Sequence, residues 1–402
     1  MANRLKVFTG GTAAGALYRS GREEDCFYFS YEPGCPPEAA VSLTMPVVAD
    51  PYDSMGGLLP LFDMNLPEGP LRHRLEVMFS KAVPDFDALS LLEIVGGSQI
   101  GRLRYTAGDE QPAEVPEESV ERLLTFRGAE DLFQDLLERF SRHSGVSGMQ
   151  PKVLLRDASP LPKIANRGAT HIVKSFDARE YPELAANEYF CLCAARHAGL
   201  PTAEARLSED RRLLVVTRFD LAPGGDYLGF EDFCVLSAMR SEGRYRGSYE
   251  KMARQIALFV SPQNRPAALR QFFASVALSV VLGNGDAHLK NFGILYDRPG
   301  GEVRLAPVYD MLSTLPYQPK DVLALELAES KAFPARKTLA AFGRTACGLS
   351  SAQVESLLQG VVSGVHLAVA DMANYAAAHP DFQGTADYLS RLFRTGAERL
   401  TA

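Results

Sequence analysis

Apolar residues recur in short alternating segments over the first hundred residues, which is the pattern of strands that are buried on one face. We expect strands at residues 5–8, 26–31, 41–45 and 100–105, with a turn at Gly10-Gly11. Two helices are expected between them, one that begins near Pro67 and one over residues 86–95. No cluster of catalytic residue types occurs in this part. Residues 1–106 are therefore expected to form a small accessory or docking domain.

Apolar residues at steps of three and four begin at Val120 and predict an amphipathic helix that reaches Phe140. An acidic segment with two prolines precedes it at residues 107–118, and its composition is typical of a linker. Strands are expected at residues 153–156, 170–176 and 212–218, and a helix at residues 183–198. Residues 107–230 are therefore expected to form a second, mixed region.

From residue 231 onward the pattern is mainly helical. Helices are expected at residues 231–239, 251–260 and 272–282, and a further helix opens with a capping-box pattern at Ser350. A basic, aromatic segment, G-R-Y-R-G-S-Y at residues 243–249, separates the first two of these helices. It is either a substrate-binding loop or a solvated connection. Residues 231–402 are expected to form a helical region.

A dense polar segment, G-N-G-D-A-H-L-K-N-F at residues 283–292, follows an apolar helix and precedes a short strand. Asp286 and Asn291 have the D-x-x-x-x-N spacing of a protein-kinase catalytic loop, in which the Asp accepts the proton of the attacking hydroxyl and the Asn binds Mg²⁺. Asp310 follows a short apolar segment, as the second metal-binding Asp of a kinase does. An isolated D-x-x-x-x-N is common by chance, so this interpretation depends on the residues that accompany it.

Lys174 lies in a segment of alternating β-branched residues, where a lysine is uncommon unless it is at an edge or has a partner. Glu188 follows fourteen residues later on an expected helix, and a strand Lys paired with a helix Glu holds the ATP phosphates in kinases. The alternative is that both side chains are exposed at the surface. Upstream, the glycine- and serine-containing segment at residues 143–152 is either a loop whose N–H groups approach phosphates or a plain hairpin turn.

Composition narrows the class of protein. The 402 residues carry a net charge of -7, with 46% hydrophobic and 23% charged residues, which suits a soluble globular chain and argues against one that coats nucleic acid through bulk charge. The six cysteines show no C-x-x-C pair and no zinc spacing, which suits a reducing compartment. We recognise no signal peptide and no run of about 18 apolar residues, so a cytoplasmic protein without a membrane segment is expected.

Together these segments resemble the HipA family of serine/threonine kinases, the toxins of bacterial toxin–antitoxin pairs. The resemblance covers nearly the whole chain. Its motifs are F-D-M-N-L-P-E-G (residues 62–69), V-G-G-S-Q-I-G (95–101), S-G-V-S-G-M-Q-P-K (144–152), H-I-V-K (171–174), A-N-E (186–188), T-R-F-D (217–220), G-N-G-D-A-H-L-K-N-F (283–292) and A-P-V-Y-D-M-L-S (306–313). It implies an α+β, protein-kinase-like bilobal fold, with an N-terminal α/β subdomain at residues 1–106, a linker helix and N-lobe at residues 107–230, and a helical C-lobe at residues 231–402.

The resemblance also implies catalytic roles. Asp286 would be the catalytic base, and Asn291 and Asp310 would bind Mg²⁺. His288 and Lys290 would shape the loop, and Lys290 would in addition stabilise the transferring phosphoryl group.

The implied ATP site contains residues from two earlier segments. Lys174, oriented by Glu188, would contact the phosphates, and residues 217–219 would hydrogen-bond adenine through their backbone. The full set of implied nucleotide contacts is Ser144, Gly145, Val146, Ser147, Gly148, Gln150, Lys152, Lys174, Glu188, Thr217, Arg218 and Phe219.

In HipA kinases an autophosphorylated serine in the loop that matches residues 144–150 can switch the enzyme off. Here the corresponding position falls near Gly145, so Ser144 and Ser147 both remain candidates. The implied partners are a HipB-type, helix-turn-helix antitoxin, through which DNA is bound indirectly, and a protein substrate in translation such as an aminoacyl-tRNA synthetase.

Two other interpretations stay open. One is a small-molecule kinase, because related folds phosphorylate antibiotics and sugars. The other is a catalytically silent co-repressor that partners a DNA-binding protein, against which the presence of Lys174, Asp286, Asn291 and Asp310 argues.

Overall fold

A computed structural model of the chain describes residues 3–19, 26–79, 86–108, 115–126, 129–146, 150, 152–158, 168–176 and 178–401. The chain forms two compact units, each built from several segments. The first unit contains Met1–Phe176, Ser208–Gly243 and Ile294–Glu302. The second contains Asp177–Leu207, Arg244–Gly293 and Val303–Ala402.

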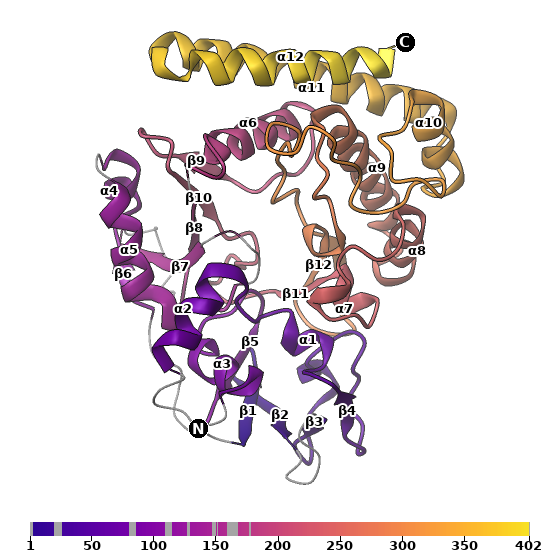
Figure 1. The fold of residues 1–402 in the computed structure, drawn as a ribbon. Coiled ribbons are helices and arrows are strands. Elements are labelled where there is room, and N and C mark those ends of the chain that lie inside the picture. The colour runs from indigo at the N-terminus through magenta and orange to yellow at the C-terminus, as the bar shows by residue number, and fades with distance from the viewer. Residues whose placement is uncertain are drawn as a thin grey trace. The chain divides into compact units, whose positions relative to one another are not determined.

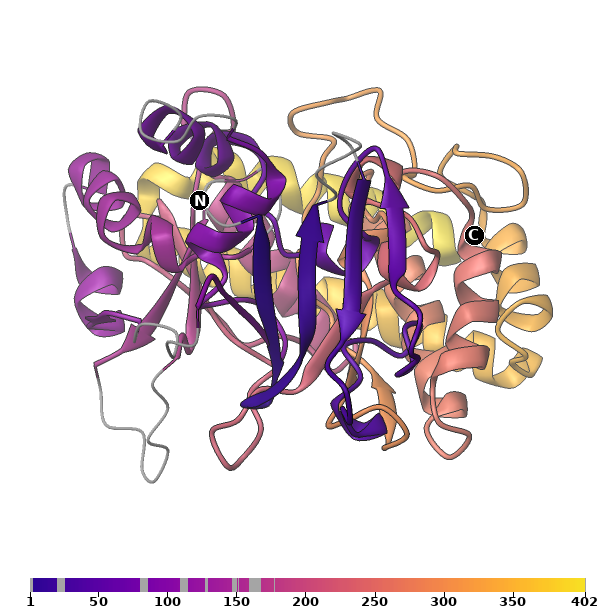
Figure 2. The same ribbon diagram turned by 90° about the horizontal axis from the view of Figure 1, so that it is seen from below.

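The first unit begins with an antiparallel sheet of order β4-β3-β2-β1-β5, seen as indigo and purple strands lying side by side in Figure 2. Its strands are β1 (Arg4–Thr9), β2 (Thr12–Arg19), β3 (Cys26–Tyr31), β4 (Tyr52–Met55) and β5 (Leu103–Thr106). The helices that accompany it are α1 (Pro60–Asp63), α2 (Gly69–Phe79) and α3 (Ala88–Val95), with a 3₁₀ turn at Pro37–Ala39. Alternate residues of β1, Leu5 and Val7, are fully buried with Phe29 and Phe62, as the period of two predicts.

Two details of this sheet differ from the sequence-based expectation. Residues 12–19 form β2, which we did not predict because its alanines and glycine have low strand propensity; pairing with β1 and β3 on both sides compensates. The strand expected at residues 41–45 is wrong, since only an isolated bridge joins Ser42 and Met45 there. The turn at Gly10-Gly11 is confirmed, because Thr9 pairs with Thr12.

A second sheet in this unit has β6 (Glu117–Glu118), β7 (Lys152–Asp157), β8 (His171–Ser175) and β10 (Leu213–Thr217) as successive neighbours. β6 runs parallel to β7, while β7, β8 and β10 are antiparallel. The connecting helices are α4 (Val120–Thr125) and α5 (Ala129–Phe140), followed by a 3₁₀ turn at Ser141–His143. Figure 1 shows both helices beside β6 and β7.

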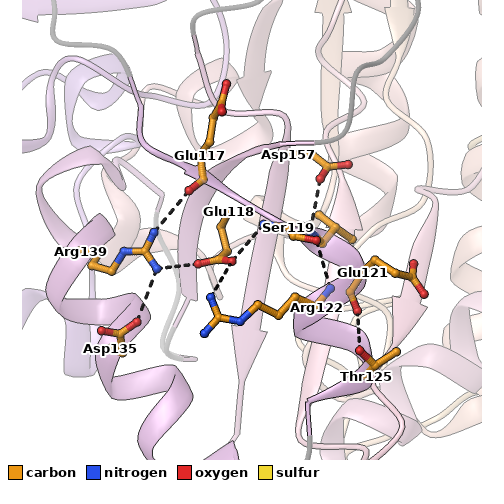
Figure 3. Close-up of polar contacts among 10 residues, drawn as sticks. Glu117, Glu118, Ser119, Glu121, Arg122, Thr125, Asp135, Arg139 and Asp157 are labelled. Carbon is orange, nitrogen blue, oxygen red and sulfur yellow. Dashed lines mark hydrogen bonds and ion pairs between the residues drawn. The ribbon is translucent and has the colours of Figure 1, made fainter.

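The end of the expected linker is structured. Glu118 is only 6% exposed, and its carboxylate lies between the guanidinium groups of Arg122 and Arg139, at 3.4 and 2.5 Å (Figure 3). Arg139 also donates to the Glu117 carbonyl, and Val120 donates its N–H to Asp157 on β7. These contacts hold residues 117 and 118 in β6, so an acidic composition that is typical of linkers here supplies a buried counter-charge instead.

Towards its end the first unit contains β11 (Gly229–Asp232), α7 (Phe233–Leu236), a 3₁₀ turn at Ser241–Gly243 and β12 (Gly293–Tyr296), and β11 pairs with β12. The helix expected at residues 231–239 is therefore mostly wrong. Asp232 explains where the short helix begins, because its side chain accepts a hydrogen bond from the Val235 N–H and so caps the first turn.

The second unit is mainly helical. Its elements are α6 (Leu184–His197), β9 (Ala205–Leu207), α8 (Tyr249–Phe259), α9 (Arg265–Leu282), a 3₁₀ turn at Leu289–Asn291, β13 (Val303–Leu305), α10 (Arg336–Thr345), α11 (Ser351–Ala378), a 3₁₀ turn at Pro380–Phe382 and α12 (Gln383–Thr401). The capping box at Ser350 is confirmed, with reciprocal bonds between Ser350 and Gln353. In Figure 1 α12, in yellow, lies along α11.

One helix of the described residues, α11, is long and apolar enough to cross a membrane, with a mean hydropathy of 1.3 over an 18-residue window. It packs against α6 and α12, and Val361, Val365 and Met372 are almost fully buried in the unit's core. The core helix of a soluble protein can have the same length and hydropathy, so α11 is weak evidence for a membrane segment.

Candidate active site

The polar segment at residues 283–292 forms a locked turn after α9. Asn284 Oδ1 accepts the N–H of Asp286 at 2.9 Å. The Asp286 carbonyl accepts both the His288 N–H at 2.8 Å and the Asn291 side-chain amide at 2.6 Å. Because these bonds join the two ends of the D-x-x-x-x-N motif, Asp286 and Asn291 are held together by the motif itself.

Two tyrosines fix this turn from outside. Tyr249 of α8 donates to the Ala287 carbonyl at 3.0 Å, and Tyr309 donates to the Lys290 carbonyl at 2.8 Å. His288 and Lys290 are both buried, with 6% and 8% of their surface exposed. Both therefore belong to the interior of the turn.

Gly285 is required by a close approach. A Cβ atom at this position would lie 2.0 Å from Asp321 Oδ2, much closer than van der Waals contact allows. The Gly285 N–H donates to Thr314 Oγ1 at 2.9 Å, and Thr314 donates its N–H to the Gly283 carbonyl at 3.0 Å. The turn is thus attached to the segment that follows Asp310.

The segment around Asp310 is attached to α9 and to the chain before Thr202. Gln271 on α9 donates to the Ala306 carbonyl at 2.6 Å, and the Val308 N–H donates to the Pro201 carbonyl at 2.8 Å. Asp310 has a φ of 51°, a left-handed conformation that a non-glycine residue adopts at a cost. Strained residues of this kind cluster at functional sites, where the surrounding structure holds them.

A small cavity with both polar and apolar lining lies between the turn and the segment around Asp310. Its volume is about 20 Å³, which is enough for one water molecule. Asn291, Asp310 and Ser279 line it, and Ser279 Oγ is fully buried and has no hydrogen-bond partner among the described residues. The unsatisfied Ser279 hydroxyl favours a polar guest, and Asp and Asn oxygens are ligands that Mg²⁺ accepts.

No group of three His, Cys, Asp or Glu residues that could hold a metal occurs in the described part of the chain. A magnesium ion in kinases is bound by few protein oxygens and by the phosphates of its nucleotide, so the pair Asn291 and Asp310 fits this type of site. A site made wholly of protein ligands, such as structural zinc, does not fit.

In the first unit, two of the residues implied to bind the nucleotide lie side by side. Lys152 on β7 is directly opposite Lys174 on β8, and each is 4% exposed. β8 lies between β7 and β10, so Lys174 is neither at an edge nor at the surface, and that alternative is excluded. Lysine side chains donate charge-assisted hydrogen bonds to phosphates, so two lysines on neighbouring strands suit an anion.

The side chain of Arg218 makes structural contacts. It is 3% exposed and forms two bonds to the Asp220 carboxylate, at 2.9 and 2.6 Å, and others to the carbonyls of Gln99 and Ala169. Burial opposes ionisation of both groups, but Arg218 outweighs it and lowers the pKa of Asp220. The Arg218 N–H donates to the Thr170 carbonyl at 3.0 Å, so neither this N–H nor the Arg218 side chain is left for the expected adenine contact, while the Phe219 ring packs against Phe230.

The glycine- and serine-containing loop is described in part. Ser144 is fully buried, and its hydroxyl donates to the Phe140 carbonyl at 2.7 Å and accepts the Leu154 N–H at 2.9 Å. A Cβ on Gly145 would lie about 2.0 Å from the end of the Gln99 side chain, which would have to move to admit one. Val146 is buried and Gln150 half-buried. Ser147 and Gly148 lie outside the described residues.

Glu188 is fully buried on α6, so the alternative of an exposed helix residue is excluded for it too. Its neighbour Asn187 exchanges hydrogen bonds with the Ser313 backbone, at 2.9 Å each way. This attaches α6 to the segment after Asp310, three residues beyond that carboxylate.

Sequence reasoning did not single out Tyr245 or Ser279. Tyr245 donates to Asp286 Oδ1 at 2.7 Å from 41 residues away, a contact that no local pattern reveals. The available signal was the basic, aromatic loop that contains it. For Ser279, the signal was a polar face on the apolar helix α9, where Gln271, Ser275 and Ser279 recur at steps of four.

Comparison with models of protein families identifies the family of this chain. The HipA N-terminal domain matches residues 5–106, and the HipA-like C-terminal domain matches residues 144–369. The chain belongs to the HipA family. This confirms the resemblance inferred from the motifs.

Two relatives of this chain are named putative kinases. The putative kinase Y4mE of Sinorhizobium fredii is 30% identical over 297 residues, which is 69% of each chain. A putative kinase of Haemophilus influenzae is 29% identical over 184 residues, or 43% of this chain and 53% of that one.

Among solved structures, HipA of Shewanella oneidensis, in complex with HipB and its operator DNA, superposes with a TM-score of 0.70. It is 20% identical and the match covers 98% of this chain and 97% of that one, so it establishes the fold. The expected α+β, kinase-like fold with an N-terminal subdomain is thereby confirmed.

Proposed function

We propose that this chain is an ATP-dependent serine/threonine protein kinase of the toxin type. The observation that most supports this is the arrangement of three residues: Asn291 is hydrogen-bonded to the Asp286 backbone and lines one small cavity with Asp310. A base and two oxygen ligands for Mg²⁺ are the minimum that phosphoryl transfer needs from a protein. Curated HipA relatives named putative kinases support the same reaction class.

In this proposal Asp286 accepts the proton of the acceptor hydroxyl, and its carboxylate is suited to this because its side chain is 40% exposed and so can meet a substrate. Asn291 and Asp310 would hold Mg²⁺, which when bound neutralises charge on the phosphates. His288 and Lys290, buried in the turn, keep Asp286 and Asn291 in place, and the Lys290 charge favours the transferring group.

The residues that would hold ATP are those that the resemblance implies. Lys152 and Lys174 contact the phosphates, for which their paired positive charge is suited. Glu188 orients Lys174, and the backbone of residues 217–219 binds adenine. The loop at residues 144–150 would also contribute to phosphate binding, but not through the Gly145 N–H, which donates to the Ser98 carbonyl at 2.9 Å.

The acceptor would be a serine or threonine of a translation component, and the enzyme would act in the cytoplasm. A HipB-type DNA-binding antitoxin would neutralise it, and DNA would be contacted through that partner. The likeness to a HipA solved with HipB and operator DNA supports this partner. The chain's net charge of -7 agrees with an indirect role at DNA.

The test uses the purified chain, γ-labelled ATP and a bacterial lysate. We expect label on a protein band, and phosphoserine or phosphothreonine in a translation component when phosphoproteomes of cells expressing wild type and Asp286→Asn are compared. Label found only on small molecules would favour the small-molecule kinase instead. Nucleotide binding without any transfer, by calorimetry and label together, would favour the silent co-repressor.

A further inference from the structure

Tyr245 lies in the loop before α8 and is fixed at its backbone and at its hydroxyl. The Arg244 carbonyl accepts the Leu289 N–H at 3.1 Å, and the Tyr245 carbonyl accepts a bond from Lys331 Nζ at 3.4 Å. The Tyr245 hydroxyl donates to Asp286 Oδ1 at 2.7 Å. Its ring packs edge-on against His288, with centroids 5.0 Å apart.

We infer that Tyr245 marks the acceptor-binding position: its hydroxyl holds the place on Asp286 that the acceptor's hydroxyl takes, and the acceptor displaces it. This inference rests on the proposed function, because it needs Asp286 to be the base. The class of ligand is a hydroxyl-bearing side chain that donates one hydrogen bond to a carboxylate.

The chemistry of the contact is that of an acceptor. In phosphoryl transfer by kinases, the substrate hydroxyl donates to the catalytic carboxylate before its proton is removed. Burial, and then the Asp286 carboxylate, raise the pKa of Tyr245, so the phenol stays protonated and remains a donor. His288 Nε2 lies 3.7 Å from the same Asp286 oxygen. Asp286 Oδ1 therefore has two neighbours, the His288 ring and, at hydrogen-bond distance, the Tyr245 hydroxyl.

Displacement is feasible because Tyr245 is a surface residue. It is 48% exposed, whereas Tyr249, four residues later, is fully buried. Moving the Tyr245 ring outward breaks one hydrogen bond and one ring contact and opens no core. An acceptor hydroxyl that replaces the broken bond restores the interaction with Asp286.

The same contact between Tyr245 and Asp286 would also be seen if Tyr245 had a different role. If Tyr245 oriented Asp286 instead of mimicking the acceptor, its removal would slow transfer to every acceptor. If it mimics the acceptor, its removal speeds transfer to every acceptor, including water. The two roles therefore predict changes of opposite sign.

The experiment compares wild type with Tyr245→Phe and Tyr245→Ala, using two acceptors: water, measured as Mg·ATP hydrolysis, and dephosphorylated casein. We expect the rate of Mg·ATP hydrolysis and the kcat/KM for casein both to rise about tenfold in each variant, while the KM for ATP stays unchanged. Tyr388→Phe is the matched control, because Tyr388 is comparably exposed, at 42%, on α12. Melting temperatures establish that all variants are folded.

Unchanged or lowered rates in both variants, with an active wild type, would overturn the inference and leave the kinase assignment intact. Absence of hydrolysis and of casein labelling in wild type and variants alike would overturn the proposed function, and the acceptor position with it.

Discussion

Lys152 and Lys174 are directly opposite each other on neighbouring strands, and both are almost completely removed from solvent. Directly opposite residues of an antiparallel pair have Cβ atoms about 4.5–5.5 Å apart, so two like charges share one face of the sheet. Such an arrangement costs stability unless negative charge lies close by. We propose that both lysines contribute to one anion site, where a nucleotide phosphate supplies negative charge.

Replacement of either lysine should weaken ATP binding without unfolding the protein. For Lys174→Met and Lys152→Met we expect the Kd for Mg·ATP to rise about 10- to 100-fold, because hydrogen bonds to charged groups contribute about 1.5–3 kcal/mol. Calorimetry measures the Kd, and Lys337→Met, at an exposed lysine of α10, is the control. An unchanged Kd in both buried variants would remove these lysines from the nucleotide site.

Asp310 should contribute more to metal binding than to binding of the adenine base. Asp310→Asn removes the only negative charge among the described side chains that line the small cavity. We therefore expect the affinity for Mn²⁺ to fall about tenfold or more. Electron paramagnetic resonance in the presence of ATP measures this affinity. Asp387→Asn, at an exposed residue of α12, changes net charge equally and should leave the affinity as it is. Equal Mn²⁺ binding by wild type and Asp310→Asn would contradict a metal role.

Short-range patterns in the sequence predict part of this site. The D-x-x-x-x-N spacing is meaningful because its two ends are joined within one turn, by the bond between Asn291 and the Asp286 carbonyl. The capping box at Ser350 and the alternation in β1 and β3 are likewise local, and each matches the structure. For the same reason the boundaries of α6 and α8 and the start of α11 fall within a few residues of those expected.

The remaining features depend on contacts between residues far apart in sequence. β2 contains alanines that only its neighbours β1 and β3 hold in a strand, and the linker-like Glu118 is structured by Arg139, 21 residues away. Tyr245 reaches Asp286 across 41 residues. Arg218, expected near adenine, forms a buried ion pair with Asp220 instead. An Arg and an Asp two residues apart need not pair, so their spacing alone does not predict this contact.

The ion pair between Arg218 and Asp220 should dominate the acid sensitivity of the first unit. Both side chains are at most 2% exposed, and removing one partner leaves the other charge buried. Arg218→Met should therefore lower the free energy of unfolding by about 3–5 kcal/mol at pH 7, measured by urea denaturation.

The pH dependence of this pair has a definite sign. The pKa of Asp220 is lowered in the folded protein, so its contribution is complete above the unfolded value of about 3.9 and is lost as the pH falls through the folded pKa. The stability difference between wild type and Asp220→Asn should thus narrow below about pH 4. A difference that is constant from pH 7 to pH 3 would show that Arg218 does not stabilise the ionised carboxylate.

Autophosphorylation, if the chain performs it in the loop at residues 144–150, should occur at Ser147 and not at Ser144. The Ser144 hydroxyl is fully buried and makes two backbone hydrogen bonds, to Phe140 and Leu154, so phosphate could be added only after these bonds break. Ser144→Ala should cost about 1–3 kcal/mol of stability and leave phosphate incorporation unchanged, whereas Ser147→Ala should abolish it. Mass spectrometry of each variant after incubation with ATP locates the phosphate. Phosphate on Ser144 in the wild type would mean that this end of the loop opens in solution, against the hydrogen bonds that hold it here.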